Sequence, residues 1–192
     1  LLVSQISGGQ IQKLEVRLQG EFAQHPSQPL VIATLKGLLT SALGDKINYV
    51  NASLEAKGRG IDVVEITDEL SPEFARGSLQ LVSFSDKGGH SVSGTVFGDG
   101  DLGITSIDEY PINFVPSRHM LFTRHRDMPG IIGQIGSLLG KHNVNVASMQ
   151  VGRRIVRGEA VMVLSIDDPI PPQLLGSILS MQGINEAHSV TL

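Results

Sequence analysis

The feature that most constrains the fold is the order of apolar segments after a boundary at residues 115–118 (Val-Pro-Ser-Arg). Short apolar or alternating runs are typical of strands, and they occupy residues 120–123, 143–151, 160–166 and 187–192. Segments of helical length occupy residues 131–141 and 171–181. The order along the chain is therefore strand, helix, strand, strand, helix, strand.

This order predicts a ferredoxin-like β-α-β-β-α-β unit, in which one sheet is covered by two helices. The first helical segment has a single apolar side, made by Ile131, Ile135, Leu138 and Leu139. The second begins with prolines, which a helix tolerates in its first turn. We therefore predict a complete small domain over residues 117–192.

Residues 1–116 follow another pattern, which predicts an α/β domain with an antiparallel sheet. Leu14, Val16 and Leu18 alternate with polar residues, as on a half-buried strand. Residues 86–89 (Asp-Lys-Gly-Gly) have hairpin chemistry. Further strands are predicted at 61–66, 79–84, 91–97, 104–107 and 112–115, and helices at 30–43 and 47–56. The fold class is therefore α+β, with domains 1–116 and 117–192.

The amino-acid composition argues against several classes of function. The 192 residues include no cysteine, which excludes disulfides, thiolate zinc sites and a cysteine nucleophile from this sequence. The net charge of −4 gives no electrostatic footprint for nucleic acid. The longest apolar runs, such as 161–166, are much shorter than a membrane span. Because the start, Leu1-Leu2-Val3, lacks an initiator methionine, we expect a piece of a longer chain.

No set of residues marks a catalytic or metal site. The six histidines form no pair at zinc-ligand spacing, and no G-x-S-x-G motif occurs. Gly98-x-Gly100-x-x-Gly103 matches G-x-G-x-x-G literally, but the dinucleotide fingerprint needs a helix to follow. Because residues 104–115 read as strands, we interpret this motif as a hairpin turn.

The segment 125–132 (His-Arg-Asp-Met-Pro-Gly-Ile-Ile) stands out because it joins a predicted strand, through a polar loop over 124–130, to the amphipathic helix. One interpretation is purely structural. Asp127 would cap free N–H groups of the helix, Pro129 would set φ for its first turn, and Gly130 would allow close backbone approach.

The other interpretation is a binding site for a free amino acid. Exposed N–H groups at a helix N-terminus suit a carboxylate, and Asp127 suits an ammonium group. Asn145, on the next predicted strand, can donate to and accept from the same zwitterion. Asn143 is better suited to a turn in the left-handed region.

These residues also carry a family resemblance. The spacing His125-x-Asp127-x-Pro129-Gly130-x-Ile132, followed by residues 143–147 (Asn-Val-Asn-Val-Ala), resembles ACT domains, which are amino-acid-binding regulatory modules. Residues 149–153 and 158–165 are similar to the C-terminal end of bacterial-type D-3-phosphoglycerate dehydrogenases. Residues 48–52 and 95–98 are similar to the intervening, or allosteric substrate-binding, domain that precedes the ACT domain in the longer form of that family.

The resemblance implies a regulatory fragment of an NAD-dependent oxidoreductase, which converts 3-phosphoglycerate to 3-phosphohydroxypyruvate in the first step of L-serine biosynthesis. NAD and the catalytic residues would lie outside this sequence. L-Serine would bind between ACT domains of two subunits and exert feedback control. The implied assembly is a homo-oligomer, and the implied compartment is the cytoplasm, with a plastid as the other option.

The resemblance also implies the effector ligands. His125 would be the first-strand ligand, Asp127 the loop ligand and Asn145 the ligand from the partner subunit. Backbone N–H groups near Ile131 and Ile132, beside Gly130, would receive the serine carboxylate. Some members hold an anion in the intervening domain with a lysine and an arginine; here those positions are Gly103 and Val115, which makes such a site doubtful.

Two alternatives belong to other function classes. The chain would be a pure assembly module if its ACT-like domain joins subunits and binds nothing. It would be a stand-alone binding protein, or the regulator of a different enzyme, if it responds to another amino acid such as valine or glycine.

Overall fold

The computed structural model describes residues 1–68, 77–98 and 100–192, and it confirms the α+β class. The chain forms two compact units, Leu1–Asp108 and Glu109–Leu192. Each is described by itself below. The predicted domain junction at residues 116 and 117 stays a prediction.

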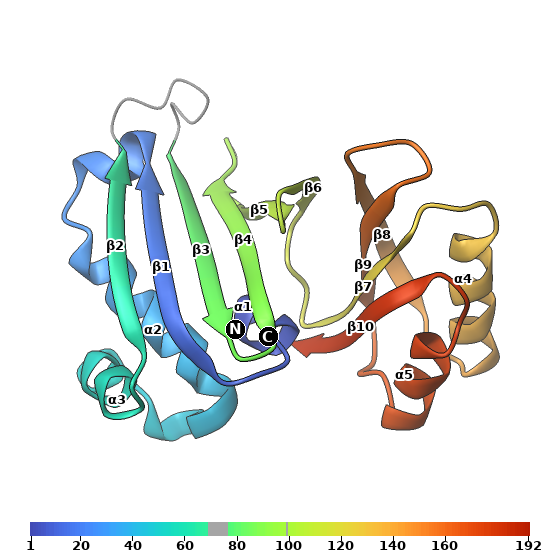
Figure 1. The fold of residues 1–192 in the computed structure, drawn as a ribbon, viewed down its shortest axis with the longest axis horizontal. Coiled ribbons are helices and arrows are strands. Elements are labelled where there is room, and N and C mark those ends of the chain that lie inside the picture. Colours follow the sequence, from blue (N-terminus) through green and yellow to red (C-terminus); the bar gives the residue numbers. More distant parts are fainter. Residues whose placement is uncertain (69–76, 99) are drawn as a thin grey trace. The chain divides into compact units, whose positions relative to one another are not determined.

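The first unit is a sheet with helices packed against it (Figure 1). Its strand order begins β2-β1-β3-β4-β5. Leu14, Val16 and Leu18 of β1 are fully buried, as their alternation predicts. Helix α1 contacts β3, β4 and α2. The elements are α1 (Leu2–Ile6), β1 (Ile11–Gln19), η1 (Gly20–Gln24), α2 (Gln28–Leu43), η2 (Gly44–Lys46), α3 (Ala52–Gly58), β2 (Asp62–Asp68), β3 (Ser78–Ser85), β4 (Gly88–Val96) and β5 (Leu102–Ile107).

This sheet is mixed and not wholly antiparallel, because β1 and β2 pair in parallel. The connection between them contains α2 and α3, and such a helical crossover returns the chain to the same end of the sheet. The pairs β1–β3, β3–β4 and β4–β5 are antiparallel, as predicted.

The predicted helix over 47–56 is wrong at its start, because α3 begins only at Ala52. Asn48 Oδ1 accepts hydrogen bonds from the N–H groups of Val50 and Asn51, at 2.8 and 3.0 Å. Asn51 Oδ1 accepts one from Asn48 N at 2.8 Å. These side chains replace the hydrogen bonds that a helix would form, so the segment is a turn.

The second unit contains the predicted ferredoxin-like arrangement, with strand order β10-β7-β9-β8 and antiparallel pairing throughout (Figure 1). A short strand before it, β6, lies against β8. Gly152 of β8 permits this approach, because a Cβ there would lie 2.5 Å from the carbonyl oxygen of Pro111. The elements are β6 (Tyr110–Phe114), β7 (His119–Arg126), α4 (Ile131–Lys141), β8 (Val146–Arg153), β9 (Glu159–Ile166), α5 (Pro172–Leu179) and β10 (Ile184–Thr191).

Helices α4 and α5 share one core with the sheet. Ile131, Ile135 and Leu139 of α4 pack in one cluster with Leu174 and Ile178 of α5. Strand residues complete this cluster, among them Leu121, Met162, Leu164, Ile166 and Ala187. The helical spacing of the apolar residues in 131–141 is therefore explained by burial against the sheet.

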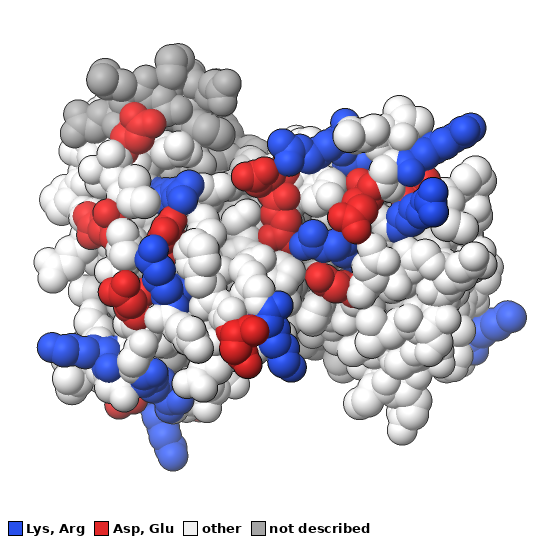
Figure 2. All heavy atoms as spheres, viewed as in Figure 1, with Lys and Arg blue, Asp and Glu red and all other residues white. Residues whose placement is uncertain are grey.

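The surface carries mixed charge. Figure 2 shows acidic and basic side chains interspersed over the described part of the face that it presents. Among the described residues, no helix is long and apolar enough to span a bilayer. Within the same residues, no three His, Asp or Glu side chains are placed to share a metal ion.

Candidate functional site

A hollow of about 320 Å³ lies where the end of β7 meets the start of α4. Five of the six predicted effector-site residues line it: His125, Asp127, Gly130, Ile131 and Ile132. The β8–β9 hairpin and the loop before α4 supply the rest of the lining: Met128, Pro129, Val151, Arg153, Val156 and Arg157.

His125 belongs to β7 and not to the predicted loop over 124–130, because β7 continues to Arg126. It follows Leu121 and Thr123 in the row that faces the helices. The side chain is 1% exposed, and its Nδ1 lies 3.4 Å from Thr123 Oγ1. Burial lowers the pKa of His125, and this effect outweighs the nearby charge of Asp127, which raises it. The imidazole of His125 therefore lines the hollow in its neutral form at pH 7.

Asp127 does not cap α4, which corrects the structural interpretation of this residue. The N-cap of α4 is Gly130, and no side chain caps the helix. The carboxylate instead accepts two hydrogen bonds at Oδ2, one from Arg153 Nη1 at 2.7 Å and one from Arg157 N at 3.2 Å. The bond from Arg153 comes first among the causes that lower the pKa of Asp127. Asp127 is thus ionised and held beside the hollow.

The start of α4 places backbone donors in the same hollow. Gly130 has φ of 92°, a left-handed conformation that glycine adopts without strain. Pro129 therefore precedes the N-cap and does not set the first helical turn. No described residue accepts a backbone hydrogen bond from Ile132, so its N–H is available to a ligand.

Asn145 is the predicted residue that does not line this hollow. It lies one residue before β8 and not on the strand. Its Nδ2 donates to Asp167 Oδ2 at 2.8 Å, and Asp167 N donates to Asn145 O at 3.3 Å. Asn143 has φ of 55°, which is the left-handed turn conformation predicted for it.

Arg153 and Arg157 supply the positive charge of the site, and neither was predicted to belong to it. Arg153 ends β8, and Arg157 lies in the turn before β9. The predicted strand over 143–151 ends before Arg153, whereas β8 extends to it, so Val151 and Arg153 share one face of the observed strand. Arg153 reaches Asp127 only because β8 pairs with β9, and this pairing could not be predicted from the local sequence.

Comparison with known proteins adds to this geometry. A model of the D-3-phosphoglycerate dehydrogenase intervening domain matches residues 1–108, and a model of the ACT domain matches residues 119–184. The chain belongs to the D-3-phosphoglycerate dehydrogenase intervening-domain family. It carries an ACT domain after the intervening domain.

Curated relatives agree with this family. A D-3-phosphoglycerate dehydrogenase of Synechocystis sp. is 54% identical over 100% of this chain and 34% of its own length. One from Methanocaldococcus jannaschii is 34% identical over 100% of this chain and 36% of its own length. A chloroplastic D-3-phosphoglycerate dehydrogenase of Arabidopsis thaliana is 30% identical over 79% of this chain and 26% of its own length. The chain thus spans about a third of the length of the first of these relatives.

The intervening domain does not offer a dinucleotide fingerprint. The last two residues of the G-x-G-x-x-G sequence at 98–103 already belong to a strand, β5, and no helix opens there among the described residues. Phe97 occupies the space where a Cβ on Gly103 would lie. Asp99 of the motif lies outside the described residues. The motif at 98–103 therefore lacks the strand-then-helix geometry of a dinucleotide-binding turn.

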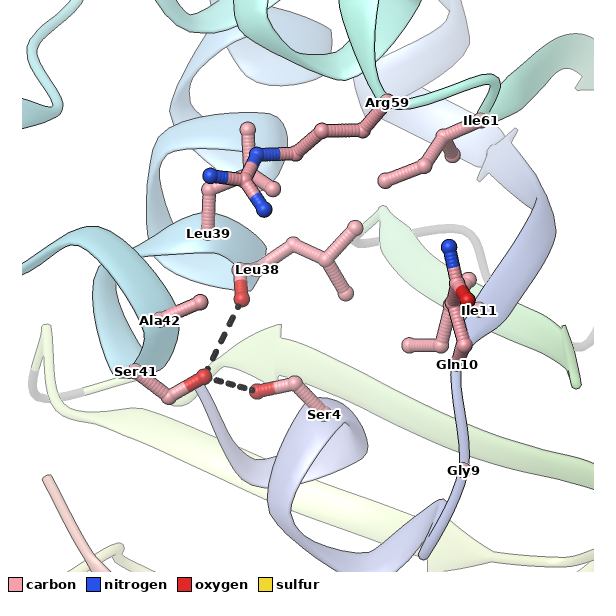
Figure 3. Close-up of a pocket in the computed structure, with 10 residues that line it drawn as sticks. All are labelled: Ser4, Gly9, Gln10, Ile11, Leu38, Leu39, Ser41, Ala42, Arg59 and Ile61. Carbon is pink, nitrogen blue, oxygen red and sulfur yellow. Dashed lines mark hydrogen bonds between the residues drawn. The ribbon is translucent and has the colours of Figure 1, made fainter.

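The intervening domain has a hollow of its own, of about 190 Å³, which Figure 3 shows. Its floor is apolar and includes Leu38, Leu39 and Ile61. Ser4 and Ser41 face each other at 3.4 Å, and Ser41 also bonds to the carbonyl of Leu38. Both hydroxyls are therefore engaged within the fold, and Arg59 adds a basic side chain to the lining.

Proposed function

We propose that this chain is the regulatory part of a D-3-phosphoglycerate dehydrogenase and that its ACT domain binds L-serine between two copies of the chain. The observation that carries the proposal is the hollow beside Asp127, which joins an ionised carboxylate to a backbone donor at the start of α4. The family models and the curated relatives support the choice of enzyme.

The chemistry of the hollow suits a small zwitterion. Asp127 attracts an α-ammonium group, and the N–H of Ile132, at the positive end of the helix dipole, attracts a carboxylate. Neutral His125 offers a ring nitrogen to a hydroxyl group without adding charge. The volume of about 320 Å³ accommodates a small amino acid together with water.

A second copy of the chain would supply Asn145. β8 is at an edge of the four-stranded sheet, where it also contacts β6, and among the described residues its backbone pairs only with β9. Apolar side chains lie exposed around the hollow and along this strand: Ile132, Met149, Val151 and Val156. In a two-fold dimer, each copy would give Asp127 to one site and Asn145 to the other.

The oxidoreductase chemistry belongs to other parts of the enzyme. The NAD-dependent oxidation of 3-phosphoglycerate to 3-phosphohydroxypyruvate would take place outside this chain, where NAD and the catalytic residues would bind. Serine, the end product of that route, would then act as feedback effector on the ACT domain. The cytoplasm is the proposed compartment, and a plastid is the other option, as in the chloroplastic relative.

Control requires that serine bind one arrangement of the subunits more tightly than another, because equal affinity shifts no population. Couplings of this kind are worth about 1–3 kcal/mol. Charge-assisted hydrogen bonds to Asp127 and to the carboxylate are strong enough to supply such a difference.

Isothermal titration of L-serine into the intact protein tests the site. We expect Asp127→Ala to reduce serine affinity at least about tenfold, because a hydrogen bond to a charged group is stronger than one between neutral groups. Asp168→Ala is the matched control, because Asp168 is an exposed carboxylate of the same domain that does not line the hollow. Equal binding by wild type and Asp127→Ala would reject the site.

Two alternatives are separated by a thermal-shift panel of amino acids. A regulator of another enzyme would respond to valine or glycine and not to serine. A pure assembly module would respond to none, and Asn145→Ala would leave its oligomeric state unchanged. A ligand at 100 times its Kd stabilises the folded state by about 2.7 kcal/mol, which such a panel detects.

A further inference from the structure

We infer that Arg153 binds the α-carboxylate of the amino-acid effector and thereby selects amino acids over amines. This inference rests on the proposed function and names a residue that the ACT motif does not include. Three observations carry it: the geometry of the Asp127–Arg153 pair, the charge of the hollow and the anchoring of the β8–β9 turn.

In the ion pair between Asp127 and Arg153, each side chain keeps hydrogen-bonding atoms that the fold does not use. Arg153 Nη1 and Arg157 N both donate to Oδ2 of Asp127, so Oδ1 has no hydrogen bond from any described residue. A guanidinium group has five N–H donors in a planar fork, and Arg153 uses only those of Nη1. An open carboxylate oxygen therefore stands next to open guanidinium donors, and both line the hollow.

This arrangement mirrors the α-carbon end of an amino acid. The α-ammonium and α-carboxylate groups are separated by a single carbon, so a zwitterion presents two adjacent opposite charges. Its ammonium group meets Asp127 Oδ1 while its carboxylate meets the remaining donors of Arg153. Arginine suits this task because its fork matches a carboxylate bidentately, which an isolated backbone N–H does not.

The net charge of the residues that line the hollow also favours a ligand with a carboxylate. Asp127 contributes one negative charge, Arg153 and Arg157 contribute two positive charges, and buried His125 is neutral. An amine without a carboxylate adds positive charge to a hollow that already has excess positive charge, so its binding is unfavourable. A ligand that also brings a carboxylate meets it favourably, so the site rejects amines of similar size.

The turn that follows Arg153 is fixed to the same loop. Asp127 N donates to Gly158 O at 2.8 Å, and Arg157 N returns a bond to the Asp127 carboxylate. The side chain of Arg153 remains 51% exposed, against 23% for that of Asp127. The backbone of Arg153 is placed before the ligand arrives by its pairing with Ala160 of β9, while its donors remain accessible, which reduces the entropy cost of binding.

Titration of two ligands into the intact protein tests this assignment. L-Serine carries the carboxylate, and L-serinamide replaces it with a neutral amide of the same shape. We expect Arg153→Gln to weaken serine about tenfold or more and to change serinamide affinity less than about twofold. Arg153→Lys keeps the charge but loses the fork, and should bind serine with intermediate affinity.

Arg154→Gln is the matched control. Arg154 is adjacent in sequence and equally charged, but its Nη1 pairs with Glu109 at 3.0 Å, and it does not line the hollow. It should bind both ligands as the wild type does. A thermal unfolding curve for each variant checks that the fold is retained.

Two results would overturn the inference and leave the proposed function standing. Serine binding by Arg153→Gln that equals or exceeds wild type would show that Arg153 does not bind the carboxylate. An equal loss of serine and serinamide affinity would show that Arg153 only positions Asp127. If the wild type binds no serine, or if Asp127→Ala binds as well as wild type, the proposed function fails and the inference fails with it.

Discussion

At the end of β7, two titratable side chains have lowered pKa values for opposite physical reasons. Burial lowers the pKa of His125 because a charged imidazolium is poorly solvated there. Hydrogen bonds from Arg153 and Arg157 lower the pKa of Asp127 because they stabilise the ionised form. At neutral pH the hollow therefore keeps its carboxylate charged and its imidazole neutral.

The pKa of His125 gives a stability prediction. Because its folded pKa lies below the unfolded value near 6.5, the unfolded chain binds more protons below that pH, and stability falls as pH decreases through this range. His125→Gln removes this dependence. Chemical unfolding at pH 7.5 and pH 5.5 should show a larger loss of unfolding free energy for wild type than for the variant. Equal losses would mean that His125 titrates alike in both states.

The pKa of Asp127 gives a second prediction at this scale. Replacement of Arg153 by glutamine removes the hydrogen bond that lowers the pKa of Asp127 most. NMR titration of the Asp127 carboxyl group should then give a pKa higher in Arg153→Gln than in wild type. Arg154→Gln should not change it. An unchanged pKa in Arg153→Gln would contradict the ion pair.

At the scale of elements, the contact between β6 and β8 depends on one residue without a side chain. A Cβ at Gly152 would lie 2.5 Å from Pro111 O and 3.2 Å from Ile112 Cβ. Because the first of these atoms is backbone, it cannot rotate away. We expect Gly152→Ala to destabilise the protein by about 1–3 kcal/mol in chemical unfolding.

Gly136→Ala is the control for this substitution. Gly136 lies on the exposed side of α4, and a Cβ added there would meet nothing within 4 Å. Alanine there should raise the unfolding free energy by about 0.5–1 kcal/mol, because it restricts the unfolded chain and favours the helix. A neutral Gly152→Ala would show that β6 does not approach β8 this closely.

The correctly predicted elements are those in which apolar residues recur with the period of a single helix or strand and are buried against a single sheet. The β-α-β-β-α-β order and the apolar side of α4 both follow from packing against one sheet. The start of α3 was missed because the side chains of Asn48 and Asn51 bond to their own backbone. The parallel pairing of β1 with β2 was missed because strand direction depends on the crossover and not on local periodicity.

For the candidate site, too, local sequence predicted some features and not those that depend on strand pairing. Sequence spacing placed Asp127, Gly130 and Ile132 around one hollow, because they adjoin one loop. It did not predict the partner of Asp127, because Arg153 comes from a strand that pairs only in the folded sheet. The capping role assigned to Asp127 was wrong for this reason.

At the scale of the whole molecule, the β8–β9 turn connects the proposed effector site to the first residue of the second unit. Arg153 and Arg157 bind Asp127 on one side of this turn. On the other, Arg154 pairs with Glu109 at 3.0 Å, at the residue where the second unit begins. Binding and conformation are linked reciprocally, so a ligand that moves this turn would also change the contact between Arg154 and Glu109.

In the proposed dimer, one serine is bound by Asp127 of one copy and Asn145 of another. Complementation tests it most directly: the intact Asp127→Ala and Asn145→Ala proteins are titrated with L-serine separately, and then after dissociation and reassembly as a mixture. We predict that each variant alone binds serine at least about tenfold more weakly than wild type. The mixture should recover about a quarter of the wild-type number of sites, because half of the randomly mixed dimers contain one intact site of two. A mixture that binds no more serine than its parents, or an Asn145→Ala protein that binds as wild type does, would contradict the account.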